Sequence, residues 1–249
     1  MRVNNRPLVV YMMCRRVIEN MSEKSKAYKR ARTAEHFAER EKMILTSTRI
    51  LMDREGIENT SLSAVAREVG LAKSSLYRYY ESREQILVAL LQEEADLMIA
   101  DFEKSLSEPK SQRDLKGIAK LWAKVCFTHP RLCLLVSQLS PILEHNLSTQ
   151  RIVEAKLQFL HRHRQMAEIL TAALPHMSEA GALAAVQYVF TIVAGLWPMK
   201  ADRKNSLAAL EHPELAHLKM NFEDTLASAI ELCLLGILAK EQNWEPVLE

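Results

Sequence analysis

Residues 62–81 of the 249-residue chain read LSAVAREVGLAKSSLYRYYE, and this stretch decides the fold. It predicts two short helices joined by a tight turn at Gly70. Helices that cross so closely need a small residue at their contact, here Ala66, and a glycine where the turn requires a positive φ. Apolar residues are expected to hold one helix on the other, while polar residues face outward. The apolar set is Val65, Val69, Leu71, Leu76 and Tyr79, and the outward set is Lys73, Ser74, Ser75, Tyr77 and Arg78.

The outward residues suit a nucleic-acid duplex. Three of the six tyrosines, Tyr77, Tyr79 and Tyr80, lie in this stretch. An exposed phenol can donate to a phosphate oxygen or pack on a thymine methyl group, and Tyr80 best fits a core position. Hydroxyl and N–H groups at the start of the first short helix predict a phosphate clamp. The contacts predicted from chemistry alone are Thr60, Ser61, Lys73, Tyr77, Arg78 and Arg83.

Charge is divided unevenly along the chain. Residues 1–90 hold 17 Lys and Arg against 11 Asp and Glu, a net charge of +6. Residues 91–249 hold 16 against 20, a net charge of −4. A basic first third is compatible with a polyanionic partner, although charge runs are often solvated surfaces or loose arms.

The remaining sequence predicts an all-α fold. Helix-forming residues dominate, and short alternating strand patterns are almost absent. A helix over about 35–54 should end at Gly56, and the two short helices should end at Val69 and Tyr80. Ser82 opens a long helix that should end before Pro109. Further helices are expected at about 112–128, 131–140, 148–174, 178–197 and 222–241, separated by Pro130, Pro141, Pro175 and Pro198.

Residues 44–91 resemble the DNA-binding domain of the tetracycline-repressor (TetR) family of bacterial transcription regulators. Two motifs carry the resemblance. The first, GIENTSL, runs from Gly56 through four residues to a hydroxyl residue and an apolar residue, Ser61 and Leu62, and the second is LYRYY at 76–80. The chain departs from the family at Ser74, where Gly or Pro is usual, and at Arg83, where Lys is commoner. These departures keep polar contacts plausible and leave the base preference open.

The resemblance implies a homodimer with an N-terminal three-helix helix-turn-helix domain and a larger C-terminal domain for ligand binding and dimerisation. The expected organisation is an N-terminal extension (1–34), a DNA-binding domain (35–84, with its motif at 62–81) and a C-terminal domain (85–249). Family contacts carried over position by position place these residues near double-stranded operator DNA: Thr60, Ser61, Ser63, Lys73, Ser74, Ser75, Tyr77, Tyr79 and Arg83.

A dimer is also expected on physical grounds, because one short recognition helix contacts too few base pairs to single out an operator. The helices at about 178–197 and 222–241 are predicted to form the interface. The first includes 180–199, a run without charged side chains that is long enough to span a membrane. Its polar residues and the final Pro198 favour a buried helix over a membrane span. The second should contribute a stripe of Leu226, Ile230, Cys233, Leu234 and Ile237.

A small-molecule effector is expected to bind in the C-terminal domain, although core packing explains the same aromatic residues. No metal or cofactor site is predicted: His161 and His163 are two apart, which is unsuitable for a shared metal on a helix. Cys126 and Cys133 could form an oxidation-sensing pair, but two buried apolar thiols are favoured. The candidate ligand-binding residues are Trp122, Phe127, His129, His145, Phe159, Met166, Phe190 and Trp197.

The sequence therefore predicts a cytoplasmic DNA-binding transcription regulator, a repressor released from its operator by a small molecule. Four dispersed cysteines without a CxxC pattern favour a reducing compartment. One alternative is a DNA-binding regulator that needs no ligand. Another is an all-α enzyme whose helical hairpin is incidental; the sequence offers no nucleophile–base constellation, paired carboxylates or cofactor loop in its favour.

Overall fold

The computed structural model describes residues 35–107, 114–200, 208–215 and 219–242, and the described elements are all helical. The predicted N-terminal extension, 1–34, lies outside these ranges. Backbone contacts divide the chain between Tyr79 and Tyr80, five residues before the predicted boundary. Residues 80–84 thus belong with the larger unit, to which Glu81 is tied by an ion pair with Arg151.

The first unit holds a helix over residues 35–55 and two short helices, α2 (Leu62–Val69) and α3 (Lys73–Leu76). The long helix ends at Gly56, whose φ is 82° and whose N–H donates to the Met52 carbonyl. Side chains from all three helices share one core. Its buried members include Ile44, Leu45, Leu51, Met52, Val65 and Leu76.

The prediction that the second short helix reaches Tyr80 is wrong, because α3 ends at Leu76. The hydrogen bonds show why. The Tyr77 N–H still donates to the carbonyl four residues back, but the Arg78 and Tyr79 N–H groups donate to carbonyls only three residues back. This tightened last turn ends the α-helix.

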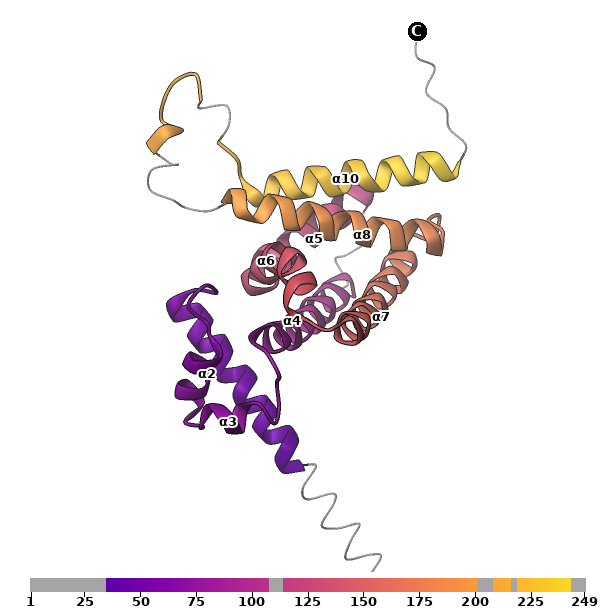
Figure 1. Ribbon diagram of the computed structural model, residues 1–249. Coiled ribbons are helices and arrows are strands. Elements are labelled where there is room, and N and C mark those ends of the chain that lie inside the picture. The colour runs from indigo at the N-terminus through magenta and orange to yellow at the C-terminus, as the bar shows by residue number, and fades with distance from the viewer. Residues whose placement is uncertain (1–34, 108–113, 201–207, 216–218, 243–249) are drawn as a thin grey trace, which may run out of the picture. The chain divides into compact units, whose positions relative to one another are not determined.

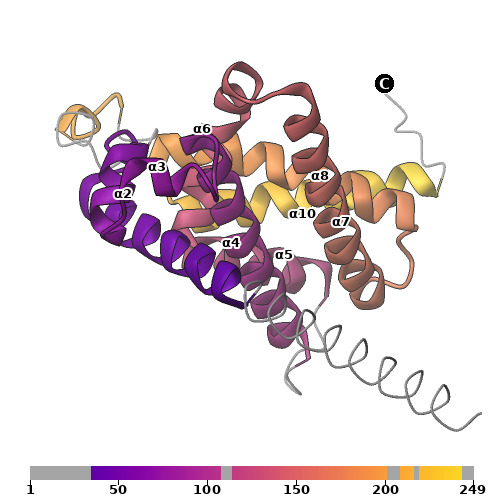
Figure 2. The same cartoon turned by 60° about the horizontal axis from the view of Figure 1, so that its bottom comes forward.

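The described part of the second unit includes six long α-helices and a 3₁₀ turn, η1 (Figure 1). α4 packs on α5, α6 and α7, α8 packs on α6 and α7, and α10 lies across α5 and α8. Figures 1 and 2 both show α8 and α10 side by side. The bounds are Arg83–Leu106 (α4), Leu115–Thr128 (α5), Pro130–Asn146 (α6), Thr149–Ala173 (α7), Glu179–Leu196 (α8), Trp197–Lys200 (η1) and Phe222–Glu241 (α10).

Polar N-caps fix where most of these helices begin. A side-chain oxygen of the cap accepts a backbone N–H of the first turn in α4, α5, α7, α8 and α10. The caps are Ser82, Asp114, Ser148, Ser178 and Asn221. One predicted end is wrong: α6 continues through Pro141 to Asn146. Proline removes one backbone donor and crowds the preceding turn, yet here it does not end the helix.

Candidate DNA-binding surface and ligand pocket

The turn between α2 and α3 has the geometry that its sequence predicts. Gly70 adopts a left-handed conformation, with φ 73° and ψ 31°. Its N–H donates to the Arg67 carbonyl, and the Leu71 N–H donates to the Ala66 carbonyl at 2.9 Å. A Cβ at Gly70 would meet no atom within 4 Å. The glycine is therefore required by the backbone angle rather than by lack of space.

α3 has one buried anchor and a polar outer surface. Leu76 has no exposed area, whereas Tyr77 is 49% exposed. Lys73, Ser74 and Arg78 are exposed as well, and Ser75 is half-buried. α3 and the turn that follows it thus offer two cations, hydroxyls and a phenol to solvent. All of these groups can donate hydrogen bonds to phosphate oxygens and base edges.

The start of α2 adds a second polar surface. Ser61 is exposed, and its hydroxyl accepts the Ala64 N–H at 3.2 Å. Ser63, in the first turn, is exposed. Thr60 differs: it has no exposed area, and its hydroxyl donates to the Gly56 carbonyl at 2.9 Å. The prediction that the Thr60 side chain clamps a phosphate is wrong, because the side chain closes the preceding turn instead.

Tyr79 and Tyr80 have different environments from Tyr77. The Tyr79 ring stacks on Phe37, with centroids 4.5 Å apart, and is half-buried. Tyr80 is only 8% exposed, as predicted for a core position. Tyr77 is therefore the tyrosine of this stretch whose ring is mostly open to a partner.

An ion pair fixes α2 on the long first helix. The Arg54 guanidinium donates through Nη1 and Nη2 to the two Glu68 carboxylate oxygens, at 3.2 and 2.8 Å. It also pairs with Glu55 at 2.9 Å. Arg54 holds the pKa of the Glu68 carboxyl below its ordinary value. Sequence inspection missed this pair, because the partners are fourteen residues apart across a turn.

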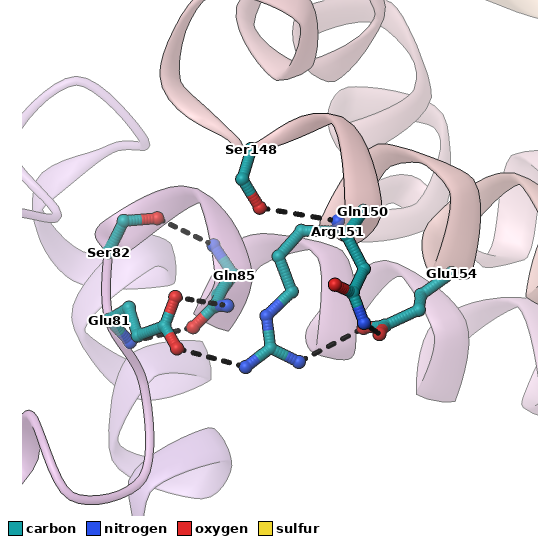
Figure 3. A network of polar contacts seen from close by, with 7 residues as sticks. All are labelled: Glu81, Ser82, Gln85, Ser148, Gln150, Arg151 and Glu154. Atoms are coloured by element: carbon teal, nitrogen blue, oxygen red, sulfur yellow. Dashed lines mark hydrogen bonds and ion pairs between the residues drawn. The ribbon is translucent and has the colours of Figure 1, made fainter.

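A polar network ties the start of α4 to the start of α7 (Figure 3). The Ser82 hydroxyl accepts the Gln85 N–H at 3.2 Å, and the Gln85 side-chain oxygen accepts the Glu81 N–H at 2.6 Å. Arg151 then bridges Glu81 and Glu154, with N–O distances of 3.0 Å to each. Arg83, predicted near DNA, lies half-buried in the first turn of α4.

The second unit encloses an apolar pocket with an empty volume of about 630 Å³, counting its open mouth. Five helices, α4 to α8, line it, and most of the lining is aliphatic, aromatic or sulfur-containing. Burial raises the pKa of Cys133 to about 12 and also raises that of Cys126, so both thiols stay protonated at neutral pH. The lining is Leu91, Ala95, Met98, Ile99, Trp122, Cys126, Leu132, Cys133, Val136, Phe159, Arg162, His163, Met166, Val186, Val189, Phe190 and Val193.

Half of the predicted ligand residues line this pocket: Trp122, Phe159, Met166 and Phe190. Phe127 and Trp197 instead pack around Phe222 and hold the Lys200 ammonium, 4.4 and 4.5 Å from their ring centroids. His129 pairs with Asp101 at 2.9 Å. These three residues do not line this pocket, and their role in ligand binding stays a prediction. His145 lies in α6, but its side chain is outside the described part of the structure.

Helices α8 and α10 each combine a buried and an exposed stripe. The prediction that Leu226, Ile230 and Leu234 contact a second subunit is wrong, because these side chains have no exposed area within their own subunit. Charged residues are exposed near the helix ends, at Glu179, Asp224, Lys240 and Glu241. Between the ends, the exposed stripes are uncharged and include Gln187, Tyr188, Thr191 and Gly195 on α8, and Ser228, Leu232, Leu235 and Gly236 on α10. By length and apolarity alone, Glu179–Lys200 is the one described helix that could cross a membrane, and 33% of its most apolar window is buried.

Two family models cover most of the chain. Residues 44–90 match the model of bacterial regulatory proteins of the tetR family, and residues 92–241 match the tetracyclin repressor-like C-terminal domain. The chain belongs to the tetR family. The helix-turn-helix surface thus lies in the first matched domain, and the pocket lies in the second.

Relatives of this TetR-family regulator agree with that assignment. An HTH-type transcriptional regulator of Staphylococcus aureus is 32% identical over 69 residues, which span 28% of this chain and 37% of that protein. Such relatives are transcription regulators and not enzymes. Dimers and small-molecule ligands are typical of the family.

Two solved structures of family members are similar to this chain to different degrees. The TetR family repressor AlkX from Dietzia, implicated in biodegradation of n-alkanes, has a TM-score of 0.51 at 12% identity, covering 78% of this chain and 93% of its own. The TetR family transcriptional regulator PfmR from Thermus thermophilus has a TM-score of 0.46 at 20% identity, covering 77% and 97%. At 12% identity the likeness to AlkX concerns the fold alone.

Proposed function

We propose that this TetR-family regulator is a dimeric repressor that leaves its operator when a small apolar molecule binds in the second unit. The observation that carries the proposal is the combination of exposed cations on α3 and the turn after it with an apolar pocket in one chain. The first suits the charged surface of a duplex, and the second suits a molecule that water solvates poorly.

The proposed DNA contacts are the exposed side chains of α3, of the turn that follows it and of the start of α2. Lys73 and Arg78 supply charge for phosphates, while Ser74 and Tyr77 supply donors near base edges. Ser61 and Ser63 add hydroxyls beside the N–H groups of the first turn of α2, which favour an anion. Ser75, Tyr79 and Arg83 are half-buried, so we assign them smaller parts.

The proposed dimer forms through the exposed stripes of α8 and α10. The two aliphatic hydroxyls are already bonded within their own helices: Thr191 donates to the Gln187 carbonyl at 3.0 Å, and Ser228 to the Asp224 carbonyl at 2.9 Å. Two large side chains, Leu232 and Tyr188, are 71% and 55% exposed. Burying these uncharged stripes against a second copy removes apolar surface from water at little polar cost.

The proposed link between pocket and operator is α4. Four pocket residues, Leu91, Ala95, Met98 and Ile99, lie on this helix, and its cap Ser82 follows the DNA-binding unit by three residues. A ligand that favours a different position of α4 therefore changes the population of DNA-competent dimers. A hundredfold preference for that state corresponds to about 2.7 kcal/mol.

Sequencing of genomic fragments captured by the purified full-length protein tests the DNA-binding part. We expect a short, imperfectly palindromic site, and loss of capture with Tyr77→Ala. Tyr77→Phe, which removes only the hydroxyl donor, should weaken capture less than Tyr77→Ala, because the ring can still pack on a thymine methyl group. Equal enrichment of random fragments by wild type and Tyr77→Ala would contradict the proposal.

Release by ligand is tested on the site so found. Compounds that raise the melting temperature should also lower operator affinity. Compounds that stabilise the protein without lowering this affinity would favour a regulator that does not respond to pocket ligands.

A further inference from the structure

The pocket contains almost no charge. Among the described residues that line it, Arg162 is the one with a permanent charge. His163, the other basic residue, packs edge-on against Phe190 with ring centroids 5.5 Å apart. Burial lowers the pKa of His163 below its ordinary value, so its imidazole is neutral at pH 7. Any anion in the pocket would depend on Arg162 for neutralisation.

Arg162 is already engaged by a carboxylate of another helix. Its Nε and Nη2 donate to the two Asp96 oxygens, at 2.8 and 2.7 Å, in a bidentate pair between α7 and α4. Its Nη1 donates to the Gln158 carbonyl at 3.2 Å. The Arg162 side chain is 13% exposed, whereas that of Asp96 is 53% exposed. The guanidinium is therefore neutralised from the solvent side, and Asp96 is absent from the pocket lining.

We propose that Asp96 keeps anionic ligands out of the pocket, because it keeps Arg162 neutralised. Asp96 would then be a specificity-determining residue that does not touch the ligand. The inference rests on the proposed function only in taking the pocket as a ligand site; it makes no use of operator release.

The physical argument is the cost of burying charge. An anionic group entering the pocket would lose water without gaining a free cation, and it would approach the Asp96 carboxylate. A neutral apolar molecule loses no hydration of a charge and is not repelled by Asp96. It also gains apolar contacts with the residues that line the pocket. Displacement of Asp96 by the anion would exchange one bidentate pair for another, with no net gain in charge pairing.

Two fluorescent probes with the same apolar body test this inference on the full-length protein. N-phenyl-1-naphthylamine is neutral, and 1-anilinonaphthalene-8-sulfonate adds one sulfonate. At pH 7 the wild type should bind the neutral probe at least about tenfold more tightly than the sulfonate. The reason is that burial of an unpaired charge costs more free energy than a tenfold change in affinity corresponds to. Equal affinity, or a preference for the sulfonate, would overturn the proposal.

Substitution of Asp96 gives the sharper result. Asp96→Asn keeps the size of the side chain and removes its charge, so sulfonate affinity should rise at least about fivefold while neutral-probe affinity stays within about twofold. Asp96→Asn/Arg162→Met should lose that gain. Asp101→Asn is the matched control, since Asp101 lies on the same helix and pairs with His129, outside the pocket lining. An unchanged probe preference in Asp96→Asn would overturn the proposal.

Pocket-filling variants show where the probes bind. Val189→Phe and Val136→Phe, on α8 and α6, should each weaken binding of the neutral probe. Unchanged binding in both would overturn the inference, because the probe would then bind elsewhere. Selective binding without release of operator DNA would leave this inference standing and contradict the proposed function, so the two can fail separately.

Discussion

The turn around α3 and the pocket of the second unit use apolar and charged side chains in opposite ways. In the first unit Leu76 is buried to hold α3, while Lys73 and Arg78 are exposed. In the second unit apolar side chains face the empty space, and the charge of Arg162 is neutralised by Asp96. The first surface thus fits a polyanion whose binding depends on salt, and the second fits a neutral molecule whose binding does not.

The largest effect is expected from the anchor of α3. Leu76→Ala should destabilise the first unit by about 2–5 kcal/mol, because it leaves a cavity where no residue surface is exposed. Chemical denaturation followed by circular dichroism checks this value. Leu157→Ala is the matched control, since Leu157 is 60% exposed; it should change stability by no more than about 0.5 kcal/mol. Similar losses in both would contradict the packing described here.

The next largest effect is expected from a substitution in the proposed dimer stripe. Leu232→Glu places a charge on an uncharged, exposed face of α10 and should weaken dimerisation at least about tenfold, or about 1.4 kcal/mol. Leu157→Glu introduces the same charge on α7 and should not. Equilibrium sedimentation at micromolar protein measures both. A dimer unaffected by Leu232→Glu would show that the interface lies elsewhere.

Two glycines should respond to substitution for different reasons. At Gly70 the limit is the positive φ, so Gly70→Val should destabilise by about 1–2 kcal/mol and Gly70→Asn by less, since Asn adopts this conformation more readily. At Gly181 the limit is space: a Cβ would lie 2.9 Å from Ile237 Cγ2 and would also meet the Glu241 carboxylate. Gly181→Ala should therefore lower the melting temperature. Tolerance of Val at Gly70 would contradict the turn geometry.

The smallest effects concern acid stability. Arg54 lowers the pKa of Glu68, and hydrogen bonds from the Ser178 hydroxyl and N–H lower that of Glu241. A lowered folded-state pKa means that each carboxylate contributes stability above its unfolded value, and this contribution is lost as the pH falls through the folded value. Glu68→Gln and Glu241→Gln should each reduce stability at pH 7 and flatten its decline below about pH 4.5. Denaturation series at pH 3–7 would show parallel curves for variant and wild type if the pairs were unimportant.

Local features of the sequence predicted much of the fold. Gly70 required a left-handed turn, Ser82 and Gln85 predicted the start of α4, and Pro109 placed its end within a few residues. Each of these signals acts within about four residues, so it can be read without the tertiary structure. Pro141 misled the prediction because proline only disfavours a helix interior, and α6 tolerates it.

Contacts between distant residues were beyond the sequence. Arg54 with Glu68, Arg151 with Glu81 and Arg162 with Asp96 join different helices or their flanking turns. Side chains around a helix differ in direction by about 100° per residue, so aromatic character did not show which rings face the pocket. Phe159 does and Phe127 does not.

The salt dependence of operator affinity tests the central claim most directly, because the claim is that the exposed cations of α3 and the turn after it, Lys73 and Arg78, contact phosphates. Lys73→Ala/Arg78→Ala removes up to about four contacts from a dimer and should lower the slope of log affinity against log salt by about 3–4. Lys120→Ala, an exposed lysine of α5, should leave the slope unchanged. An unaltered slope in the double variant would contradict the assignment of α3 to DNA.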